Sequence, residues 1–142
     1  MRAITLVLGA ATVVVGWASL LFELFGPTYR TASSYITSTG ATGSSEGNTS
    51  LVAVGVSPVT LFFLGLIALG FLFVFAGALL EYRGDGGRGL MLVGLVPPVL
   101  LTSISFGLAT LFPATVLGVV ATAFAFGTPR NGAPRKRQRH KD

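Results

Sequence analysis

The sequence predicts an all-α fold: a four-span transmembrane helical bundle with one long Ser/Thr/Gly-rich extracellular loop and a disordered basic C-terminal tail. Three observations lead to this prediction. The 142 residues are 51% hydrophobic and 11% charged, with a mean hydropathy of +0.76, which is too apolar for an ordinary soluble domain. The apolar residues form runs long enough to span a membrane. The basic residues fall almost entirely on one side of the predicted bundle.

The first span is predicted over residues 3–25, and Gly26-Pro27 ends it because proline cannot continue a helix. Its first half resembles a signal peptide, but the apolar run continues to the length of a retained anchor. A narrow stripe of small and polar residues recurs along it at alternating steps of four and three residues. This spacing keeps the stripe on one face of a helix, where we expect partner helices to pack. The stripe comprises Thr5, Gly9, Thr12, Gly16, Ser19 and Glu23.

A polar outer loop is expected over residues 26–57, where Ser, Thr and Gly dominate the composition. The composition of residues 39–50 predicts a flexible low-complexity segment. The second span is predicted over residues 58–80. Ser57 is a good N-cap, and Pro58 occupies the first helical position, where its missing N–H donor costs nothing.

The apolar stretch over residues 89–126 is predicted to fold back on itself, because a single helix of that length would measure about 57 Å. The favoured turn lies at residues 103–107 and gives a third span over 89–103 and a fourth over 107–127. The alternative division at Phe112-Pro113 leaves a shorter last span.

Two local features are expected in these last spans. Pro97-Pro98 should kink the third span, with Gly94 leaving room for the proline ring. The fourth span carries small residues at strict four-residue spacing, a ridge suited to close helix contact, and Pro113 beside the ridge should bend the helix. The ridge comprises Thr110, Ala114, Gly118 and Thr122.

The charge distribution predicts the topology. With four spans and a cytoplasmic N-terminus, nine of the ten Lys and Arg residues lie on the inside, and Arg30 alone lies outside. We therefore expect both termini in the cytoplasm, in a cell membrane or alternatively a virion membrane. The chain divides into a membrane domain over residues 1–129 and a basic tail over residues 130–142. The basic residues of the tail are Arg130, Arg135, Lys136, Arg137, Arg139 and Lys141.

The sequence holds little that could perform chemistry. Cysteine is absent, the single histidine lies in the tail, and no catalytic, cofactor or metal-binding pattern is present, so we expect neither an enzyme nor a cofactor. Glu23 is the one acidic residue within an apolar run. It is either an interfacial carboxylate in contact with water or a proton or ion site facing the bundle.

The remaining charged residues are expected to be exposed to solvent. The glycine-rich segment over residues 81–88 predicts a tight turn between two spans. Its carboxylates should form solvated pairs, Glu81 with Arg83 and Asp85 with Arg88. Arg30 could pair with Glu23 across the outer loop.

These features favour a small integral membrane protein of structural or assembly type. Its small-residue seams would pack its own helices, a membrane-protein partner or further copies of the chain. The tail would contact anionic lipid or nucleic acid through its positive charge. The alternative is an ion- or proton-conducting transporter or channel subunit that uses Glu23.

Overall fold

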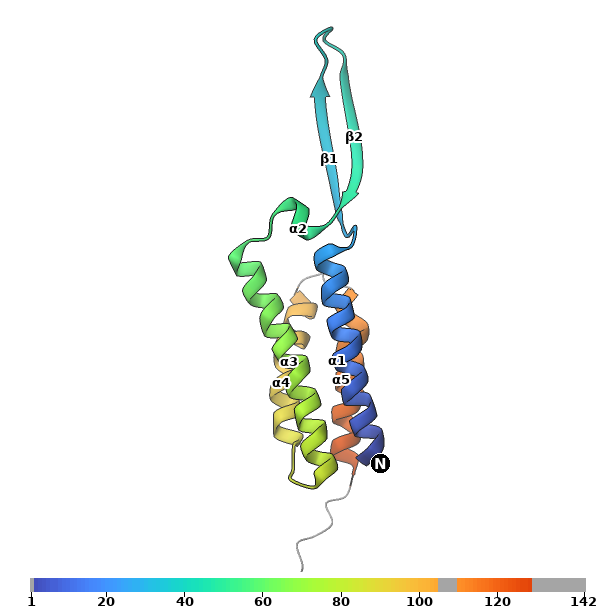
Figure 1. Ribbon diagram of the computed structural model, residues 1–142, viewed down its shortest axis with the longest axis vertical. Coiled ribbons are helices and arrows are strands. Elements are labelled where there is room, and N and C mark those ends of the chain that lie inside the picture. The colour runs from blue at the N-terminus through green and yellow to red at the C-terminus, as the bar shows by residue number, and fades with distance from the viewer. Residues whose placement is uncertain (1, 105–109, 129–142) are drawn as a thin grey trace, which may run out of the picture.

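The computed structural model describes residues 2–104 and 110–128, apart from the side chains of Tyr29 and Tyr35. This part of the chain is mostly helical. Four long helices lie side by side, and a two-stranded β-hairpin projects from one end of the bundle (Figure 1). In chain order the elements are α1 (Arg2–Phe25), β1 (Tyr29–Ile36), β2 (Thr42–Thr49), α2 (Leu51–Val54), α3 (Pro58–Arg83), α4 (Arg88–Ile104) and α5 (Phe112–Gly127).

The four long helices run alternately up and down and form a closed arrangement. Helix α3 packs against α1 and α4, and α5 packs against the same two helices from the other side. The start of α1, the α3–α4 turn and the end of α5 therefore share one end of the bundle, which we call the tail end (Figure 1). The hairpin and α2 lie at the opposite end, the hairpin end. Consecutive long helices are therefore antiparallel to each other.

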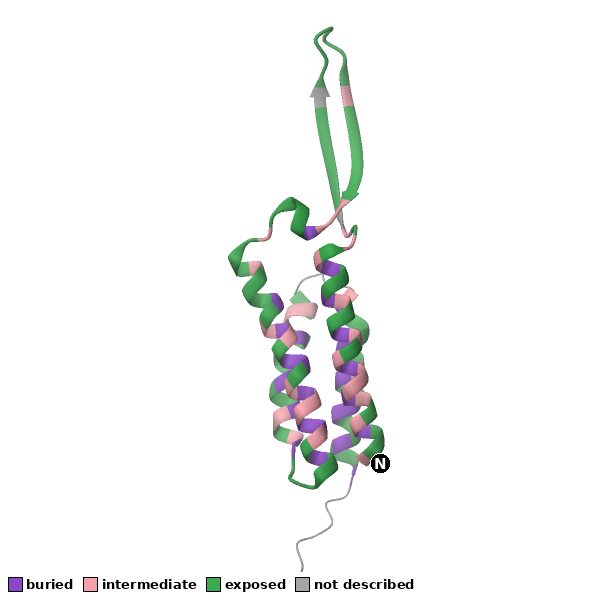
Figure 2. Cartoon of the chain, viewed as in Figure 1, coloured by how far each residue is buried: buried purple, intermediate pink, exposed green. Residues whose placement is uncertain are grey.

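Two of these helices are long and apolar enough to cross a membrane. Helices α1 and α3 have 24 and 26 residues, whereas the apolar helices α4 and α5 have 17 and 16. Buried positions recur along the four long helices, whereas the hairpin is almost entirely exposed (Figure 2). The outer surface of the bundle carries many exposed large hydrophobic side chains. Val14 on α1 is 68% exposed and Phe62 on α3 is 63% exposed. Such a surface is typical of a protein surrounded by lipid.

The second predicted span begins as expected. Ser57 caps α3 by accepting a hydrogen bond from the Thr60 amide, at 3.1 Å, and Pro58 is the first helical residue. The helix continues past the predicted end at residue 80 as far as Arg83. Gly84 then ends it in the left-handed conformation, with φ of 95°, and donates its amide to the Leu80 carbonyl.

The division of the last apolar stretch combines both alternatives. Helix α4 ends at Ile104, as in the favoured division, and α5 begins at Phe112, as in the alternative one. Most of the predicted turn over residues 103–107, and the predicted start of the last span, lie outside the described residues. The expected bend at Pro113 is wrong. Pro113 lies in the first turn of α5, where a missing N–H donor is tolerated.

The predicted flexible segment over residues 39–50 is wrong, because most of it belongs to β2. The strands pair in antiparallel register from Tyr29 opposite Thr49 to Ile36 opposite Thr42. Hydroxyl groups bond across the pair. Thr31 Oγ1 donates to the Gly47 carbonyl at 3.0 Å, and the hydroxyls of Ser33 and Ser45 are 2.7 Å apart. Cross-strand bonds between Ser and Thr side chains thus stabilise a hairpin whose faces are both largely exposed.

Helix α4 continues through Pro97 and Pro98, which lack the N–H groups that would bond the carbonyls of the preceding turn. The carbonyl freed by Pro98 is that of Gly94. A Cβ atom placed on Gly70 would lie 2.5 Å from this oxygen, so the α3 backbone directly contacts it. The Cα–H group of Gly70 therefore covers a polar atom that would otherwise lack a partner inside the bundle.

Candidate functional site: seams and buried carboxylates

The stripe on α1 faces the interior of the bundle. Thr5, Gly9, Thr12, Gly16 and Glu23 are buried, and Ser19 is half-buried. Two of its glycines receive side chains of α3. A Cβ atom on Gly16 would overlap the buried ring of Phe71, and one on Gly9 would lie 2.6 Å from the Cβ of Ala78. The stripe therefore brings α1 and α3 close together, and we call this contact the α1/α3 seam.

The ridge on α5 faces α1 and α4. Its members Ala114, Gly118 and Thr122 are buried, and Thr110 is half-buried. A Cβ atom on Gly118 would lie 2.8 Å from Leu95 Cδ2 of α4 and 3.3 Å from Thr12 Cγ2 of α1. Gly118 thus lies where three helices meet, opposite the middle of the α1 stripe. We call the contact between the stripe and the ridge the α1/α5 seam.

A third seam, between α3 and α4, was missed by the sequence analysis. Gly70 faces Gly94, and Gly77 faces Gly87 and Met91. A Cβ atom on Gly77 would lie 2.7 Å from the Gly87 carbonyl oxygen, which leaves no room for a side chain. The detectable signal was a seven-residue spacing along the sequence, between Gly70 and Gly77 and again between Gly87 and Gly94. Such a spacing places small residues on one face of a helix.

Glu23 faces the bundle and is 3% exposed, so its interpretation as a water-contacting interfacial group is wrong. Thr110 Oγ1 donates a hydrogen bond to Glu23 Oε2 at 2.7 Å, which joins the end of α1 to the start of α5. Among the described residues no cationic side chain pairs with Glu23. Arg30 instead pairs with Glu46 across the hairpin, where both side chains are largely exposed.

A hollow of about 540 Å³ on the surface of the bundle is lined by residues of α1 and by Thr110. Ser19 and Thr110 are the polar residues of its otherwise apolar lining, which includes Phe22. Thr110 therefore touches both the hollow and the buried carboxyl of Glu23.

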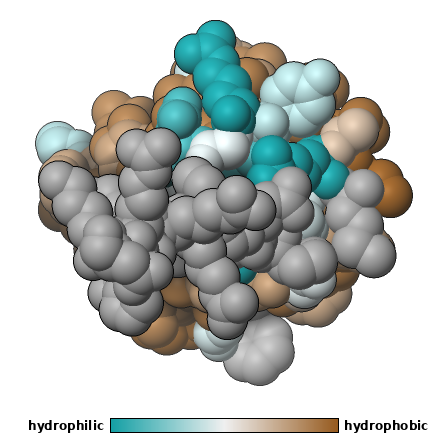
Figure 3. Space-filling model, turned by 90° about the horizontal axis from the view of Figure 1, so that it is seen from below, coloured by the Kyte–Doolittle hydropathy of each residue, from teal (hydrophilic) through white to brown (hydrophobic). Residues whose placement is uncertain are grey.

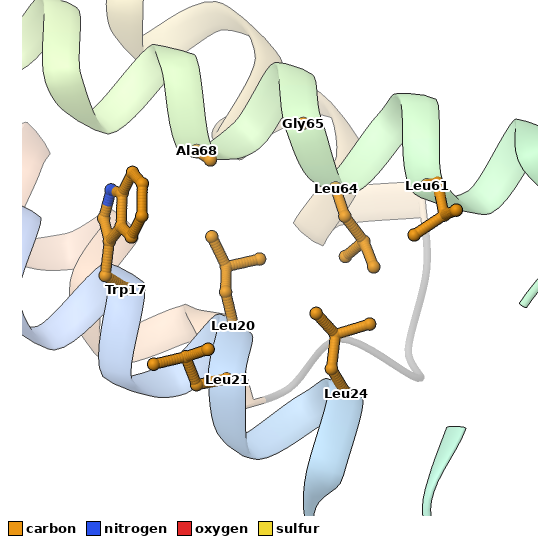
Figure 4. Close-up of a pocket in the computed structure, with 8 residues that line it drawn as sticks. All are labelled: Trp17, Leu20, Leu21, Leu24, Leu61, Leu64, Gly65 and Ala68. Carbon is orange, nitrogen blue, oxygen red and sulfur yellow. The ribbon is translucent and has the colours of Figure 1, made fainter. Parts of the chain in front are cut away.

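An apolar pocket of about 220 Å³ lies between α1 and α3 in the half of the bundle nearer the hairpin. Figure 4 shows leucine side chains from both helices pointing into it, with Trp17 at one side. Gly65 leaves it open, since a Cβ atom there would meet nothing within 4 Å.

The prediction of solvated charge pairs in the α3–α4 turn is wrong, because Glu81 is 5% exposed and pairs with Arg88. Arg88 donates to Glu81 Oε1 from Nη2 at 3.0 Å and from Nε at 3.1 Å. Its Nη2 also donates to the Thr128 carbonyl at 2.5 Å, and the guanidinium lies over the Phe126 ring. This cluster joins α3, α4 and α5, and Glu81 Oε2 is buried with no hydrogen-bond partner among the described residues.

Hydrophilic side chains gather at the tail end of the bundle (Figure 3). Arg2, Arg83 and Arg88 belong to this end, while Arg30 belongs to the hairpin at the other. The basic residues of the tail lie outside the described residues. Within the described residues, no group of three or more His, Cys, Asp or Glu side chains could hold a metal ion.

Comparisons with protein-family models, with curated proteins and with solved structures find no match. Functional inference therefore depends on the buried seams, the two buried carboxylates and the distribution of charge.

Proposed function

We propose that this protein is a small four-span membrane protein of structural or assembly type, with both termini in the cytoplasm and a basic tail that binds anionic lipid headgroups. The observation that carries the proposal is the asymmetry of the molecule. A hydroxyl-rich hairpin projects from one end, and among the described residues the cationic groups other than Arg30 belong to the opposite end. In a membrane, this charge asymmetry orients the basic end towards the cytoplasm.

The packing supports a scaffold rather than an enzyme. The glycines of the three seams contact side chains or backbone of the same chain, so these surfaces are already occupied by its own helices. Arg88 holds the Thr128 carbonyl at the end of the last described helix. We therefore expect the tail, which starts at residue 130, to lie near the membrane surface, where attraction to anionic lipids contributes about 1 kcal/mol per basic residue.

Removal of residues 135–141 tests the tail proposal. We expect purified protein in detergent to bind vesicles containing anionic lipid, and the truncated protein to lose most of this binding because five basic residues are removed. Co-sedimentation at increasing salt measures the effect, since electrostatic attraction weakens as salt rises. A matched variant with these residues replaced by Gln controls for tail length. Binding unchanged by both variants, or binding to nucleic acid alone, would contradict the lipid assignment.

Glu23 supports a second candidate function, an ion- or proton-conducting subunit. Buried carboxyl groups within membranes commonly mark transport routes. Glu23 is buried, and its hydrogen-bond partner Thr110 lines a surface hollow.

Glu23→Gln tests this second function. In reconstituted vesicles we expect it to reduce ion or proton flux by about a hundredfold, the lower end of what a positioned proton-transfer group contributes. Glu46→Gln on the exposed hairpin is the matched control. Flux that is equal in Glu23→Gln and wild type would exclude this function for Glu23.

A further inference from the structure

The β-hairpin has two open edges. The sheet of the described residues contains only β1 and β2, so each strand has one side without a neighbouring strand. In an antiparallel pair, alternate residues point their N–H and C=O groups away from the partner strand. The eight residue pairs run without interruption from Tyr29 opposite Thr49 to Ile36 opposite Thr42. Each edge is therefore a regular row of backbone donors and acceptors to which a further strand can bond.

The two edges lack the features that usually prevent such pairing. Proteins protect an open edge with proline, lysine, a bulge or a covering element. Neither strand contains proline or lysine, and the register of the described strands has no bulge. The hairpin stands clear of the helices, and apart from the half-buried Gly43 and Thr49 its described strand residues are exposed (Figure 1). Because a lone two-stranded hairpin is marginally stable in water, further strands would stabilise it.

The direction of the hairpin limits the ways in which two copies can pair. The hairpin projects from the bundle roughly along the helices (Figure 1). Copies inserted into one membrane with the same orientation therefore hold their hairpins in the same direction, with equivalent residues at the same height. Two kinds of edge contact are then open to neighbouring copies. Either like strands lie parallel to each other, or β1 of one copy lies antiparallel to β2 of the next.

The charges of the hairpin favour the contact between unlike strands. β1 contains one charged residue, Arg30, and β2 contains one, Glu46. Their exposed side chains pair diagonally within the hairpin. At equal heights, a contact between like strands would bring Arg30 close to its own counterpart, or Glu46 close to its own, and equal charges repel. A contact between β1 and β2 instead brings Arg30 of one copy close to Glu46 of the next.

We propose that the hairpin is an assembly surface for a second copy of this chain, in which β1 of one copy pairs antiparallel with β2 of the next. This inference rests on the proposed membrane orientation and names the partner for the structural or assembly function. In the joined sheet, Arg30 and Glu46 alternate from copy to copy, so each charge has an opposite charge on both sides. The contact is heterologous, and each copy therefore contacts two neighbours, as in a cyclic oligomer.

Disulfide formation between two single-cysteine variants of the full-length protein tests this contact. The chain contains no cysteine, and Ser33 of β1 and Ser45 of β2 are exposed and opposite each other in the register. The variants Ser33→Cys and Ser45→Cys carry different affinity tags, are expressed together and are oxidised in membranes. We expect the mixed disulfide between the two variants to be the main product and the disulfides between identical variants to be minor.

A charge exchange separates the contact between copies from the ion pair within each hairpin. Adding Arg30→Glu to the Ser33→Cys variant should reduce the mixed disulfide about fivefold, the effect expected of one exposed ion pair. Adding Glu46→Arg to the Ser45→Cys variant should restore it. Neither copy then has an ion pair within its own hairpin, so only a contact between copies explains the restoration. Asp85→Arg, the same charge change at the exposed α3–α4 turn, is the matched control and should not restore the disulfide.

The outcomes decide the pairing separately from the membrane orientation. Absence of the mixed disulfide, or an equal amount of disulfide between two Ser33→Cys copies, would overturn the pairing. Restoration by Glu46→Arg that is no greater than by Asp85→Arg would also overturn it. A membrane-impermeant maleimide, applied to reduced Ser33→Cys protein in intact cells, tests the orientation. Lack of labelling would overturn the orientation whatever the disulfide result, whereas labelling without the mixed disulfide would overturn the pairing alone.

Discussion

Gly70→Ala is expected to destabilise the bundle by about 3 kcal/mol, the upper part of the range for overpacked cores. The added Cβ atom would lie 2.5 Å from the Gly94 carbonyl oxygen and 3.0 Å from Pro98 Cδ. Both neighbours belong to the backbone or to a rigid ring, so they cannot move away as a flexible side chain would. Helices α3 and α4 must separate, and the Gly94 carbonyl then loses its cover.

The matched control for this prediction is Gly65→Ala. Gly65 lies on the same helix, but a Cβ atom there meets nothing within 4 Å, so its substitution should be neutral or stabilising by up to about 1 kcal/mol through helix propensity. Unfolding in mixed micelles, followed by circular dichroism, measures both free energies. Equal stabilities for the two variants would show that the α3/α4 contact is not as close as described.

Arg88→Met is expected to lower the free energy of unfolding by about 3–5 kcal/mol, the typical effect of removing one partner of a buried ion pair. The substitution leaves the Glu81 carboxylate buried without its two hydrogen bonds and frees the Thr128 carbonyl. The double variant Arg88→Met/Glu81→Gln should recover much of this loss, because it removes the uncompensated charge. The same unfolding measurement detects both effects.

Arg30→Met provides the comparison for this ion pair. The side chains of Arg30 and Glu46 are 75% and 57% exposed. Arg30→Met should therefore lower the free energy of unfolding by no more than about 1 kcal/mol. A cost for Arg30→Met as large as that for Arg88→Met would mean that burial does not distinguish the two pairs.

Features set by short-range pattern could be predicted from the sequence. The alternating spacing of the α1 stripe identifies the face that the structure buries. Ser57 and Pro58 mark the start of α3, because a helix N-terminus depends on adjacent residues alone. The end of α1 before Gly26-Pro27 also follows from local chemistry.

Features that depend on distant residues could not be predicted in this way. The hairpin has no alternating apolar face, since its strands pair through hydroxyl groups and backbone, so the usual period-two signal is missing. Arg88 pairs with Glu81 rather than with Asp85, and it also donates a hydrogen bond to the Thr128 carbonyl at the end of α5. No local sequence pattern indicates that this distant carbonyl lies near Arg88. The burial of Glu23 likewise depends on Thr110, which is 87 residues away in the chain.

We propose that a membrane-spanning bundle places the hairpin outside the cell and both the α3–α4 turn and the tail inside. The chain contains no cysteine, so single-cysteine variants can be labelled without background. Ser44 in the hairpin and Asp85 in the turn are exposed sites, and Gln138 reports on the tail.

The decisive measurement is labelling of Ser44→Cys, Asp85→Cys and Gln138→Cys in intact cells with a membrane-impermeant maleimide. We expect Ser44→Cys to react in intact cells and the other two variants to react only after the membrane is permeabilised. Reaction of Asp85→Cys together with Ser44→Cys in intact cells would place both ends of the bundle on one side of the membrane and would contradict the account.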